Sequence, residues 1–474
     1  MLIGQPELPE LSPAARDKAR SLLEQALGPS KVLTDRLACE RFASDESEAV
    51  PRIPDAVVVA ESADDILAAL AVAREAEVPI TPRAGGTGRT GGAVPVAGGI
   101  VLATQGMSGI KDIDRAEGLA VVEPGVILGD LHAAVEREGL FYPPDPNSWE
   151  SCALGGNVAE NAGGPRAFKY GVTRNYVLGL EAFLIGGQRL SVGKRTVKGV
   201  TGYDVTALLV GSEGTLAVFG DITLRLVPKP PAVMTLMCLF QDVRASAAAV
   251  AGMIETGIVP RCIELLDHGT LAAMREAGNP IDPQAGAMLL IEVDGAEAEC
   301  ERQAERVADA SAAALSVLVA QDAAQREKLW AARREMSHAV RKKAKHKLSE
   351  DIVVPRQRTV ELLERVERQS EASGVRCLTY GHAGDGNLHV NFLWNDDDEV
   401  PAVERCIEQL FRDVVELGGT LSGEHGIGVL KAPYLHLEQS AELIALERDL
   451  KRVFDPQGLL NPGKIFTGAP HRAC

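Results

Sequence analysis

The stretch Pro82-Arg-Ala-Gly-Gly-Thr-Gly-Arg-Thr-Gly-Gly92 places five glycines within eleven residues. It follows a predicted strand at 78–81, which comes after a strand at 56–60 and a helical stripe introduced by Ser62-Ala-Asp-Asp65, a sequence similar to a capping box. Glycine lets successive backbone N–H groups approach and surround a phosphate. The spacing matches neither Gly-x-Gly-x-x-Gly nor a Walker loop. Taken alone, the stretch is therefore as compatible with a flexible turn as with a phosphate site.

The same half of the chain contains further loops of this kind. A hairpin is predicted at 177–192, because two apolar strands flank the turn Gly186-Gly187. The run Val227-Pro-Lys-Pro-Pro231 ends regular structure and predicts a domain boundary. The additional loops are Pro143-Pro-Asp-Pro146, Leu154-Gly-Gly-Asn-Val-Ala-Glu-Asn-Ala-Gly-Gly164 and Gly211-Ser-Glu-Gly-Thr-Leu216.

Two later tracts gather histidines and a glutamate among glycines: Tyr380-Gly-His-Ala-Gly-Asp-Gly-Asn-Leu-His-Val-Asn391 and Ser422-Gly-Glu-His-Gly426. The imidazoles of His382 and His389 and the carboxylate of Glu424 suit a divalent metal with open coordination positions. His425 is a candidate proton acceptor, because imidazole titrates near neutral pH. A single histidine on a strand is more often a packed core residue. The prediction therefore rests on the concentration of these groups.

The bulk composition is that of a globular protein of two or three domains, with 474 residues, 46% hydrophobic and 24% charged. The net charge of −17 argues against nucleic acid as a main partner, since phosphate binding requires a basic face. The eight cysteines form no Cys-x-x-Cys pair, which disfavours iron–sulfur clusters and favours reduced thiols in the cytoplasm. The N-terminus lacks signal-peptide character, and no apolar run approaches the length of a membrane span.

Between about 232 and 418, predicted strands alternate with long helices, which indicates an antiparallel sheet with helices on one side. Within this region, helices are expected at 244–256, 297–315 and 359–373. Another is expected at 12–27, and a last one near the C-terminus.

In this order, the glycine-rich loops resemble the FAD domain of the vanillyl-alcohol oxidase / p-cresol methylhydroxylase class. Within that class the chain resembles the D-lactate dehydrogenase / glycolate oxidase flavoprotein subunit family, from about Pro51 to Phe466. The resemblance implies an α+β fold with a two-part FAD-binding domain at 1–230, whose core is about 51–230. An antiparallel-sheet-and-helix substrate (cap) domain would occupy 231–418. Residues 419–474 would carry Glu424 and His425 and return to the FAD domain.

The resemblance also implies which residues contact FAD. The first glycine loop would hold the pyrophosphate, the middle loops would line the flavin, and the loop at 213 would contact the adenine and ribose. Covalent members of the class carry a histidine where this chain has Thr87, so the FAD is expected to be non-covalent; His132 is expected on a helix surface. The expected contacts are Pro82, Arg83, Ala84, Gly85, Gly86, Thr87, Gly88, Gly91, Gly92, Pro144, Asp145, Gly155, Gly156, Asn161, Gly164, Glu213, Gly214, Ile222 and Asn461.

In metal-dependent members, the positions matching His382, His389 and Glu424 bind a divalent ion, usually zinc or a manganese-like ion. The position matching His425 takes the substrate hydroxyl proton, and the position matching Asn391 orients the substrate.

A substrate-binding arginine is implied by the motif Leu329-Trp-Ala-Ala-Arg333. Arg333 would pair with the substrate carboxylate, because a guanidinium binds a carboxylate in a bidentate manner. Arg334 follows directly and leaves the register of this assignment open.

The implied activity is FAD-dependent, metal-assisted oxidation of a D-2-hydroxy acid such as D-lactate or glycolate to the 2-oxo acid, with hydride transfer to flavin N5. A D-2-hydroxyglutarate dehydrogenase is the alternative within the family. Relatives that act on dicarboxylates place a lysine where this chain has Ser349, with Lys347 two residues away. The roles of Lys347 and Ser349 are left open.

Two further alternatives are less favoured. A non-redox FAD transferase of the alkyl-glycerone-phosphate synthase type would need a phosphate-binding cluster and a run of histidines, and a non-catalytic flavin subunit would lack the metal ligands. The electron acceptor stays open among a quinone, a cytochrome, an electron-transferring flavoprotein and a partner subunit. Any membrane contact is expected to be peripheral, through that acceptor, and a homodimer is compatible with the sequence.

Overall fold

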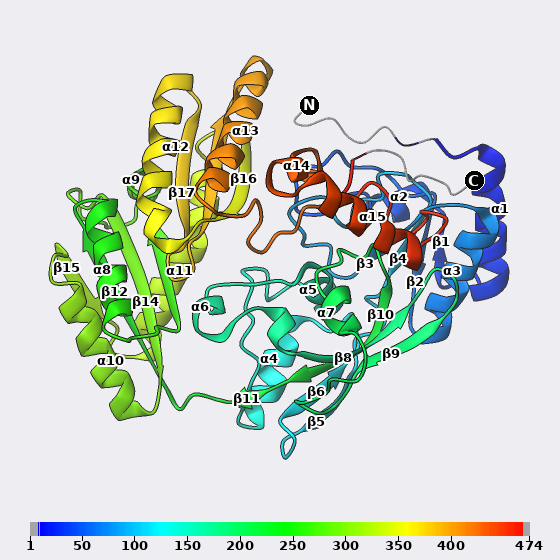
Figure 1. Ribbon diagram of the computed structural model, residues 1–474, viewed down its shortest axis with the longest axis horizontal. Coiled ribbons are helices and arrows are strands. Elements are labelled where there is room, and N and C mark those ends of the chain that lie inside the picture. The colour runs from blue at the N-terminus through cyan, green and yellow to red at the C-terminus, as the bar shows by residue number, and fades with distance from the viewer. Residues whose placement is uncertain (1–7, 9, 468–474) are drawn as a thin grey trace. The chain divides into compact units, whose positions relative to one another are not determined.

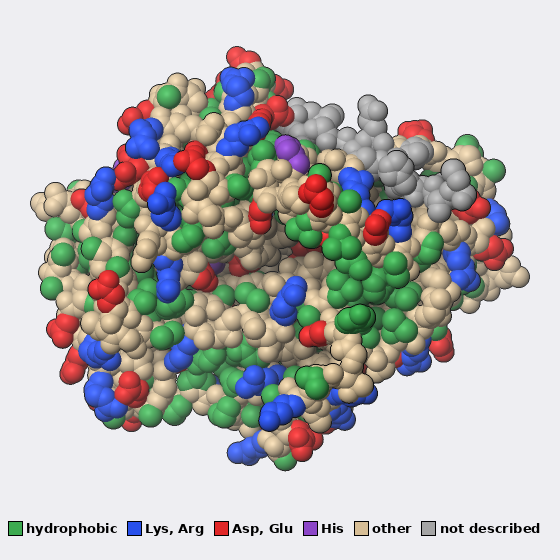
Figure 2. All heavy atoms as spheres, in the orientation of Figure 1, with side chains coloured by type: hydrophobic (Ala, Val, Ile, Leu, Met, Phe, Trp, Pro, Cys, Tyr) green, Lys and Arg blue, Asp and Glu red, His purple; other side chains and the backbone are tan. Residues whose placement is uncertain are grey.

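The computed structural model describes residue 8 and residues 10–467, apart from the side chains of 332, 335 and 338. Most of the N-terminal decapeptide and Cys474 lie outside the described residues. The chain forms two compact units (Figure 1): one contains the described residues up to 162, 172–229 and those from 424 onward, and the other contains 163–171 and 230–423. Acidic and basic side chains are interspersed over the face shown in Figure 2, so the net charge of −17 forms no single patch there.

The first unit begins with a small sheet in the order β1-β2-β4-β3. Strands β2 and β3 both run parallel to β4, as a β-α-β start requires. Ser62 caps the connecting helix α3 by accepting a hydrogen bond from the Asp65 amide, and Glu77 ends that helix in a left-handed conformation. The elements are α1 (Pro13–Leu27), β1 (Val32–Leu33), α2 (Arg36–Glu40), β2 (Ala56–Val59), α3 (Ala63–Ala76), β3 (Ile80–Arg83) and β4 (Ile100–Ala103).

A second, antiparallel sheet of the first unit has the order β5-β6-β10-β8-β9. The predicted hairpin is present as β8 and β9. The elements are β5 (Ile110–Asp114), β6 (Leu119–Val122), α4 (Leu128–Arg137), β7 (Leu140–Phe141), α5 (Leu154–Glu160), β8 (Val177–Phe183), β9 (Arg189–Gly193), α7 (Val205–Leu209), β10 (Val218–Arg225), β11 (Val227–Pro228), α14 (Leu435–Glu438) and α15 (Ala441–Phe454).

The second unit is built on a seven-stranded sheet in the order β15-β12-β14-β13-β17-β18-β16. All neighbouring strands run antiparallel, which confirms the predicted type of sheet. Its strands are β12 (Ala232–Phe240), β13 (Cys262–Leu266), β14 (Ala287–Gly295), β15 (Ser316–Val319), β16 (His346–Val353), β17 (Arg376–His382) and β18 (Asn387–Trp394); its helices are α6 (Ala167–Tyr170), α8 (Val243–Glu255), α9 (His268–Glu276), α10 (Glu297–Ala310), α11 (Ala323–Arg341), α12 (Thr359–Ser373) and α13 (Val400–Glu416).

Helices cover both faces of this sheet, so the prediction of helices on one side is wrong. On one face, side chains of α9 and α11 pack with Leu378 and Leu393 in an apolar cluster. On the other face, Ser370 of α12 accepts a hydrogen bond from the amide of Cys377. Two covered faces follow from the sequence of β18, whose eight residues are all buried.

One face of the sheet is apolar along part of its strands and polar at one end. Strand side chains alternate between faces, so residues paired across strands share a face. His382 pairs with Glu264, and Tyr380 pairs with His389. These side chains therefore lie on the same face as Leu378, and Tyr380 belongs to the apolar cluster that α9 and α11 cover. The fold places the predicted metal ligands at the polar end of a largely apolar surface.

Candidate functional site

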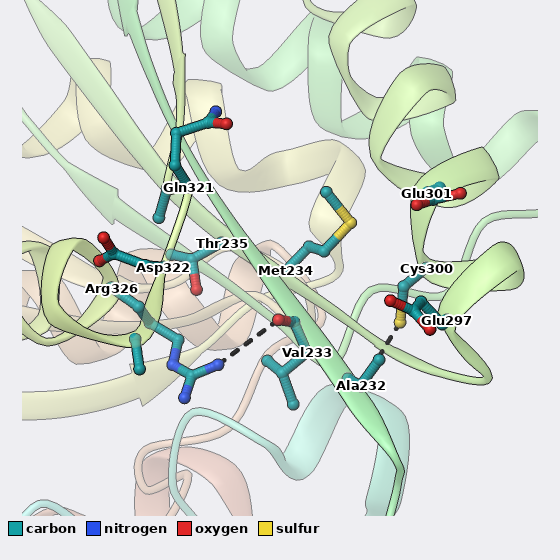
Figure 3. A pocket seen from close by; sticks show the side chains of 12 residues that line it. Ala232, Val233, Met234, Thr235, Glu297, Cys300, Glu301, Gln321, Asp322 and Arg326 are labelled. Atoms are coloured by element: carbon teal, nitrogen blue, oxygen red, sulfur yellow. Dashed lines mark hydrogen bonds between the residues drawn. The ribbon is translucent and has the colours of Figure 1, made fainter.

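A pocket of about 280 Å³ lies beside β12 (Figure 3). Its wall includes Cys300, whose thiol faces the Ala232 carbonyl at 3.4 Å, and Arg326, which donates to the Val233 carbonyl at 3.4 Å. None of the residues that line it belongs to the predicted site. The residues that the sequence predicts for catalysis and for metal binding lie elsewhere in the molecule.

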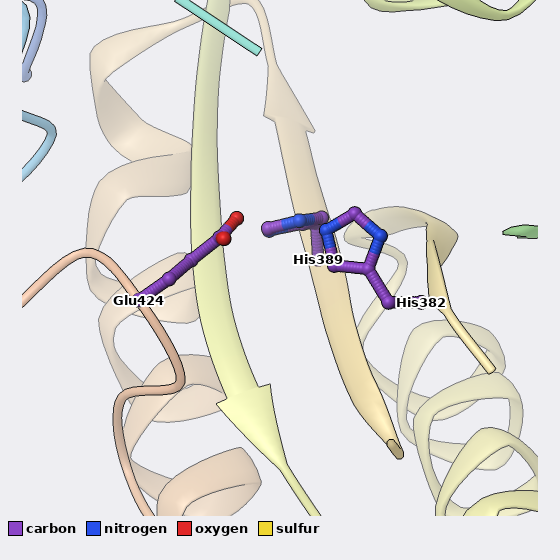
Figure 4. Close-up of side chains that lie close together, drawn as sticks. All are labelled: His382, His389 and Glu424. Carbon is purple, nitrogen blue, oxygen red and sulfur yellow. The ribbon is translucent and has the colours of Figure 1, made fainter. Parts of the chain in front are cut away.

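The three predicted metal ligands come together. One ligand atom each from His382, His389 and Glu424 lies within 4.8 Å of the others, and Figure 4 shows the carboxylate and the imidazoles directed toward one another. Both histidines are almost fully buried on adjacent strands. Glu424 follows Gly423, whose amide donates to Asp351 Oδ2 at 2.9 Å. This donor set fits zinc or manganese and leaves coordination positions for water or substrate.

Glu264 binds the candidate metal ligand His382, although the sequence did not indicate Glu264 as a site residue. Its Oε1 lies 2.5 Å from His382 Nδ1, and its Oε2 accepts from Arg333 Nε at 2.9 Å. Burial raises the pKa of Glu264, but His382 and Arg333 outweigh burial and hold the pKa below its ordinary value. A carboxylate on Nδ1 orients the ring so that Nε2 would coordinate a metal. The sequence feature that could have indicated Glu264 is a single acidic residue within the apolar strand Cys262-Ile-Glu-Leu-Leu266.

Arg333 points inward and Arg334 points outward. Arg333 is 4% exposed, and its guanidinium carbon lies 5.3 Å from the centre of the Tyr380 ring. Arg334 is exposed and pairs with Glu327 on the same helix. Of the two registers considered, the structure places only Arg333 beside the metal-ligand strands.

The side chain of Asn391 makes hydrogen bonds to other residues of the protein. Its amide donates to the carbonyls of Leu378 at 3.1 Å and His389 at 2.9 Å, and its Oδ1 accepts from the Tyr380 hydroxyl at 3.2 Å. These contacts fix the strands that carry the histidines. A role for Asn391 in orienting substrate remains a prediction.

Lys347 and Ser349 lie on the same face as Asn391, because Ser349 pairs with Asn391 across β16 and β18. Lys347 Nζ donates to the Tyr380 hydroxyl and to Ser337 Oγ, each at 3.1 Å. Burial raises the pKa of Tyr380, but Lys347 and its other polar neighbours lower it below the ordinary value. Lys347 and Arg333 thus place two cations near the ring of one tyrosine.

In the first unit, the first glycine loop meets other predicted FAD loops. A Cβ on Gly156 would lie 3.6 Å from that of Ala84, and one on Gly214 would lie 3.5 Å from Pro82 Cγ. Gly85 has no room for a side chain, because a Cβ there would lie 2.9 Å from the backbone nitrogen of Ala153. Residues 82–88 are at least partly exposed. Accessible glycine backbone from converging loops fits the FAD pyrophosphate.

Other predicted FAD residues have evident structural roles. Arg83 donates to the Ser44 carbonyl at 2.7 Å, and Asn161 ends α5 in a left-handed conformation, with φ at 55°. Ile222 is fully buried in β10, where it pairs with Val122 and Leu180. The amide of Asn461 donates to the carbonyls of Gly92 and Glu213. Gly164 lies in the segment 163–171 of the second unit.

His132 differs from the expectation of a surface histidine. It is half-buried on α4, and its Nε2 lies 3.0 Å from the carbonyl oxygen of Pro144, a predicted flavin contact. The imidazole therefore supports the loop at 143–146.

His425 lies in the loop that follows the metal ligand. Its Nε2 is 4.0 Å from Glu424 Oε1, and its backbone carbonyl accepts from Thr90 Oγ1 at 3.0 Å. The side chain is about one-fifth exposed, at 18%. An imidazole beside a carboxylate that could bind a metal suits general-base chemistry.

Within the described residues, no helix combines the length and apolar character that a membrane crossing requires.

Solved structures share the fold at low identity. A 4-ethylphenol oxidase from Gulosibacter chungangensis superposes with a TM-score of 0.79 at 18% identity, covering 99% of this chain and 100% of that one. A p-cresol methylhydroxylase gives 0.75 at 15% identity, covering 96% and 98%. An alkyldihydroxyacetonephosphate synthase gives 0.74 at 18% identity, covering 97% and 87%. The chain thus has the vanillyl-alcohol oxidase-type fold with an antiparallel-sheet domain.

Curated relatives are more similar in sequence. The chain is 39% identical over 449 residues to a glycolate oxidase subunit GlcD of Bacillus subtilis, covering 94% of this chain and 96% of that one. It is 32% identical over 453 residues to a D-lactate dehydrogenase of Anaerostipes hadrus, covering 93% and 95%. Family models match as an FAD binding domain at 54–193 and as the C-terminal domain of FAD linked oxidases at 229–465. The chain is an FAD-linked oxidoreductase that belongs to the FAD-linked oxidase family.

Proposed function

We propose that this protein oxidises a D-2-hydroxy monocarboxylate, such as D-lactate or glycolate, to the 2-oxo acid, with non-covalent FAD and a divalent metal, zinc or manganese. The observation that carries the proposal is the convergence of His382, His389 and Glu424 next to His425. The names of the curated relatives, a glycolate oxidase subunit and a D-lactate dehydrogenase, support the substrate class. In this proposal 1–230 binds FAD, 231–418 binds substrate, and 419–474 supplies Glu424 and His425.

When bound, the FAD would accept the C2 hydrogen as hydride, and the metal would lower the pKa of the substrate hydroxyl. His425 removes the hydroxyl proton. Arg333 binds the substrate carboxylate through Nη1, since its Nε and Nη2 both face Glu264. Glu264 also keeps His382 oriented. The reduced protein then passes its electrons to a separate acceptor, such as a quinone, a cytochrome, an electron-transferring flavoprotein or a partner subunit.

Anaerobic addition of D-lactate or glycolate tests the proposal, because the absorbance of bound flavin disappears on reduction. Replacing His425 by Ala should leave flavin bound and slow its reduction by about 10²–10⁴-fold, the range that a general base contributes. His436→Ala is the matched control, since this exposed histidine lies outside the site. A flavin reduced equally fast in His425→Ala and in the wild type would remove His425 from the role.

A second substrate class is favoured by Lys347. Its ammonium group lies on the same sheet face as His389 and near Arg333, so a dicarboxylate such as D-2-hydroxyglutarate would find two cations. Flavin reduction by D-2-hydroxyglutarate that is faster than with D-lactate, and that is lost in Lys347→Met, would select this class. The transferase alternative is supported only by a shared fold.

A further inference from the structure

The loop at 424–430, here called the His425 loop, is bound on two sides by one threonine of the glycine-rich stretch. Thr90 Oγ1 donates to the carbonyl of His425 at 3.0 Å. The carbonyl of Thr90 accepts from the amide of Val429 at 2.8 Å. Thr90 is only 2% exposed, so these bonds are shielded from water. The backbone of His425 is therefore fixed directly by Thr90.

Glu213 binds the middle of the same loop. Its carboxylate accepts from the amides of Ile427 at 2.7 Å and Gly428 at 2.6 Å. The residue is buried, and its own carbonyl accepts from the amide group of Asn461 at 2.8 Å. Both carboxylate oxygens therefore bind backbone within the protein, and the FAD contact that the resemblance implies for this residue stays a prediction.

Two glycines make this close fit feasible. Gly426 has a φ of 77°, and a Cβ there would lie 2.3 Å from Glu160 Oε2. Gly428 has a φ of 52°, and a Cβ there would lie 2.3 Å from the carbonyl oxygen of Thr90. Left-handed backbone and close approach both demand glycine at these positions. The His425 loop is consequently held in one place by its neighbours.

We propose that Thr90 and Glu213 are positioning residues for His425, acting through the backbone of the His425 loop. The inference rests on the proposed function, in which His425 is the base. Fixing the carbonyl of His425 on one side and the amides of Ile427 and Gly428 on the other limits the directions in which the imidazole of His425 can point. A base must meet its proton within hydrogen-bond distance, so small displacements slow the reaction steeply.

The test compares Thr90→Val, which keeps the shape but loses the hydroxyl, with Thr90→Ser, which keeps the hydroxyl. The rate constant for flavin reduction by D-lactate should fall about 10–100-fold in Thr90→Val and in Glu213→Gln. Thr90→Ser should restore it. Flavin content and the substrate dissociation constant should stay at wild-type values in both Thr90 variants. A Thr90→Val protein that reduces its flavin at the wild-type rate, or that binds no flavin, would overturn the proposal.

Two controls carry matched contacts outside the His425 loop. Thr270→Val removes a buried hydroxyl that donates to the carbonyl of Thr379, and Asp267→Asn alters a carboxylate that accepts from the amides of Thr270 and Thr379. Both should reduce flavin at the wild-type rate. An equal slowing in the controls would show that general destabilisation explains the effect.

An NMR readout separates this proposal from the proposed function. The C2–H signal of the His425 imidazole, assigned by its loss in His425→Gln, should shift and broaden in Thr90→Val but not in Thr270→Val. An unchanged signal would refute the positioning role even if the enzyme is active. A wild-type flavin that no 2-hydroxy acid reduces would refute the proposed function, while the NMR comparison would still decide the positioning role.

Discussion

At the scale of single residues, Glu264 binds two candidate functional side chains at once, the imidazole of His382 and the guanidinium of Arg333. It lies 2.5 Å from His382 and 2.9 Å from Arg333, and it is fully buried. A buried carboxylate of this kind is stable only because two partners balance its charge. Removing the charge therefore affects both the candidate metal ligand His382 and the proposed substrate-binding Arg333.

Glu264→Gln should lower metal affinity by about 10–100-fold, the usual effect of losing a carboxylate behind a histidine ligand. Competition for zinc with a chromophoric chelator measures this, and flavin absorbance shows that the protein remains folded. Glu292→Gln is the matched control, because Glu292 is also buried on this face but binds Trp330 and Thr235. Equal zinc affinity in Glu264→Gln and wild type would contradict the supporting role of Glu264.

Glu160 gives a pH-dependent prediction. Burial raises the pKa of Glu160 well above its ordinary value of 4.5, and the nearby charges of Glu213 and Asp45 raise it further. The folded state thus disfavours the ionised form, so stability is lost as pH rises from 4.5 through the folded pKa. Glu160→Gln should match the wild type below about pH 4 and melt at a higher temperature at pH 8.

Thermal unfolding between pH 4 and pH 9 checks this prediction. Exposed Glu46→Gln is the control and should track the wild type throughout. A Glu160→Gln protein that loses stability relative to wild type as pH rises would reverse the expected sign and contradict the account.

At the scale of elements, α1 and α12 follow the sequence closely, while α10 does not. The alanine-rich pattern predicted a helix at 297–315, but α10 ends at Ala310. The amide of Leu315 donates to the carbonyl of Leu239, and the next residues form the edge strand β15 beside β12. Helix propensity favoured continuation, and sheet pairing at 316–319 ended it.

The helix α15 contacts the rest of its unit through hydrogen bonds of Lys451. None of its side chains is fully buried. Lys451 Nζ donates to the carbonyls of Thr215 and Leu460 and to Asp455 Oδ2, at 2.6, 2.8 and 2.6 Å. Lys451→Met should cost about 2–4 kcal/mol in the free energy of unfolding, because it leaves the buried carboxylate of Asp455 without its cation.

Urea unfolding measures this cost. Arg412→Ala, which breaks an exposed pair with Glu408 at the same helical spacing, is the control and should cost less than about 1 kcal/mol. Similar losses in both variants would show that Lys451 is no more important than a surface ion pair.

At the scale of the whole molecule, the two proposed cofactor sites use different residues. Most of the glycine loops proposed to bind FAD lie in the first unit, whereas His382 and His389 lie in the second and Glu424 lies in the first. A chelator such as dipicolinate should therefore abolish flavin reduction and leave the flavin spectrum and stoichiometry unchanged. Adding zinc or manganese back should restore reduction. Loss of flavin during chelation, or full reduction of the flavin without metal, would contradict the proposal that separate residues hold the flavin and the metal.

The sequence by itself determined the antiparallel sheet of the second unit, the hairpin at 177–192, the glycine loops and the three candidate metal ligands, because these depend on local spacing and composition, and the resemblance of its motifs indicated the family. Only the tertiary structure identified Glu264, which is 118 residues from His382, and Thr90, which is 335 residues from His425. Pairing of buried charges and capping of distant loops depend on which strands and loops become neighbours. No periodicity within one segment encodes that, so these residues became visible only in the fold.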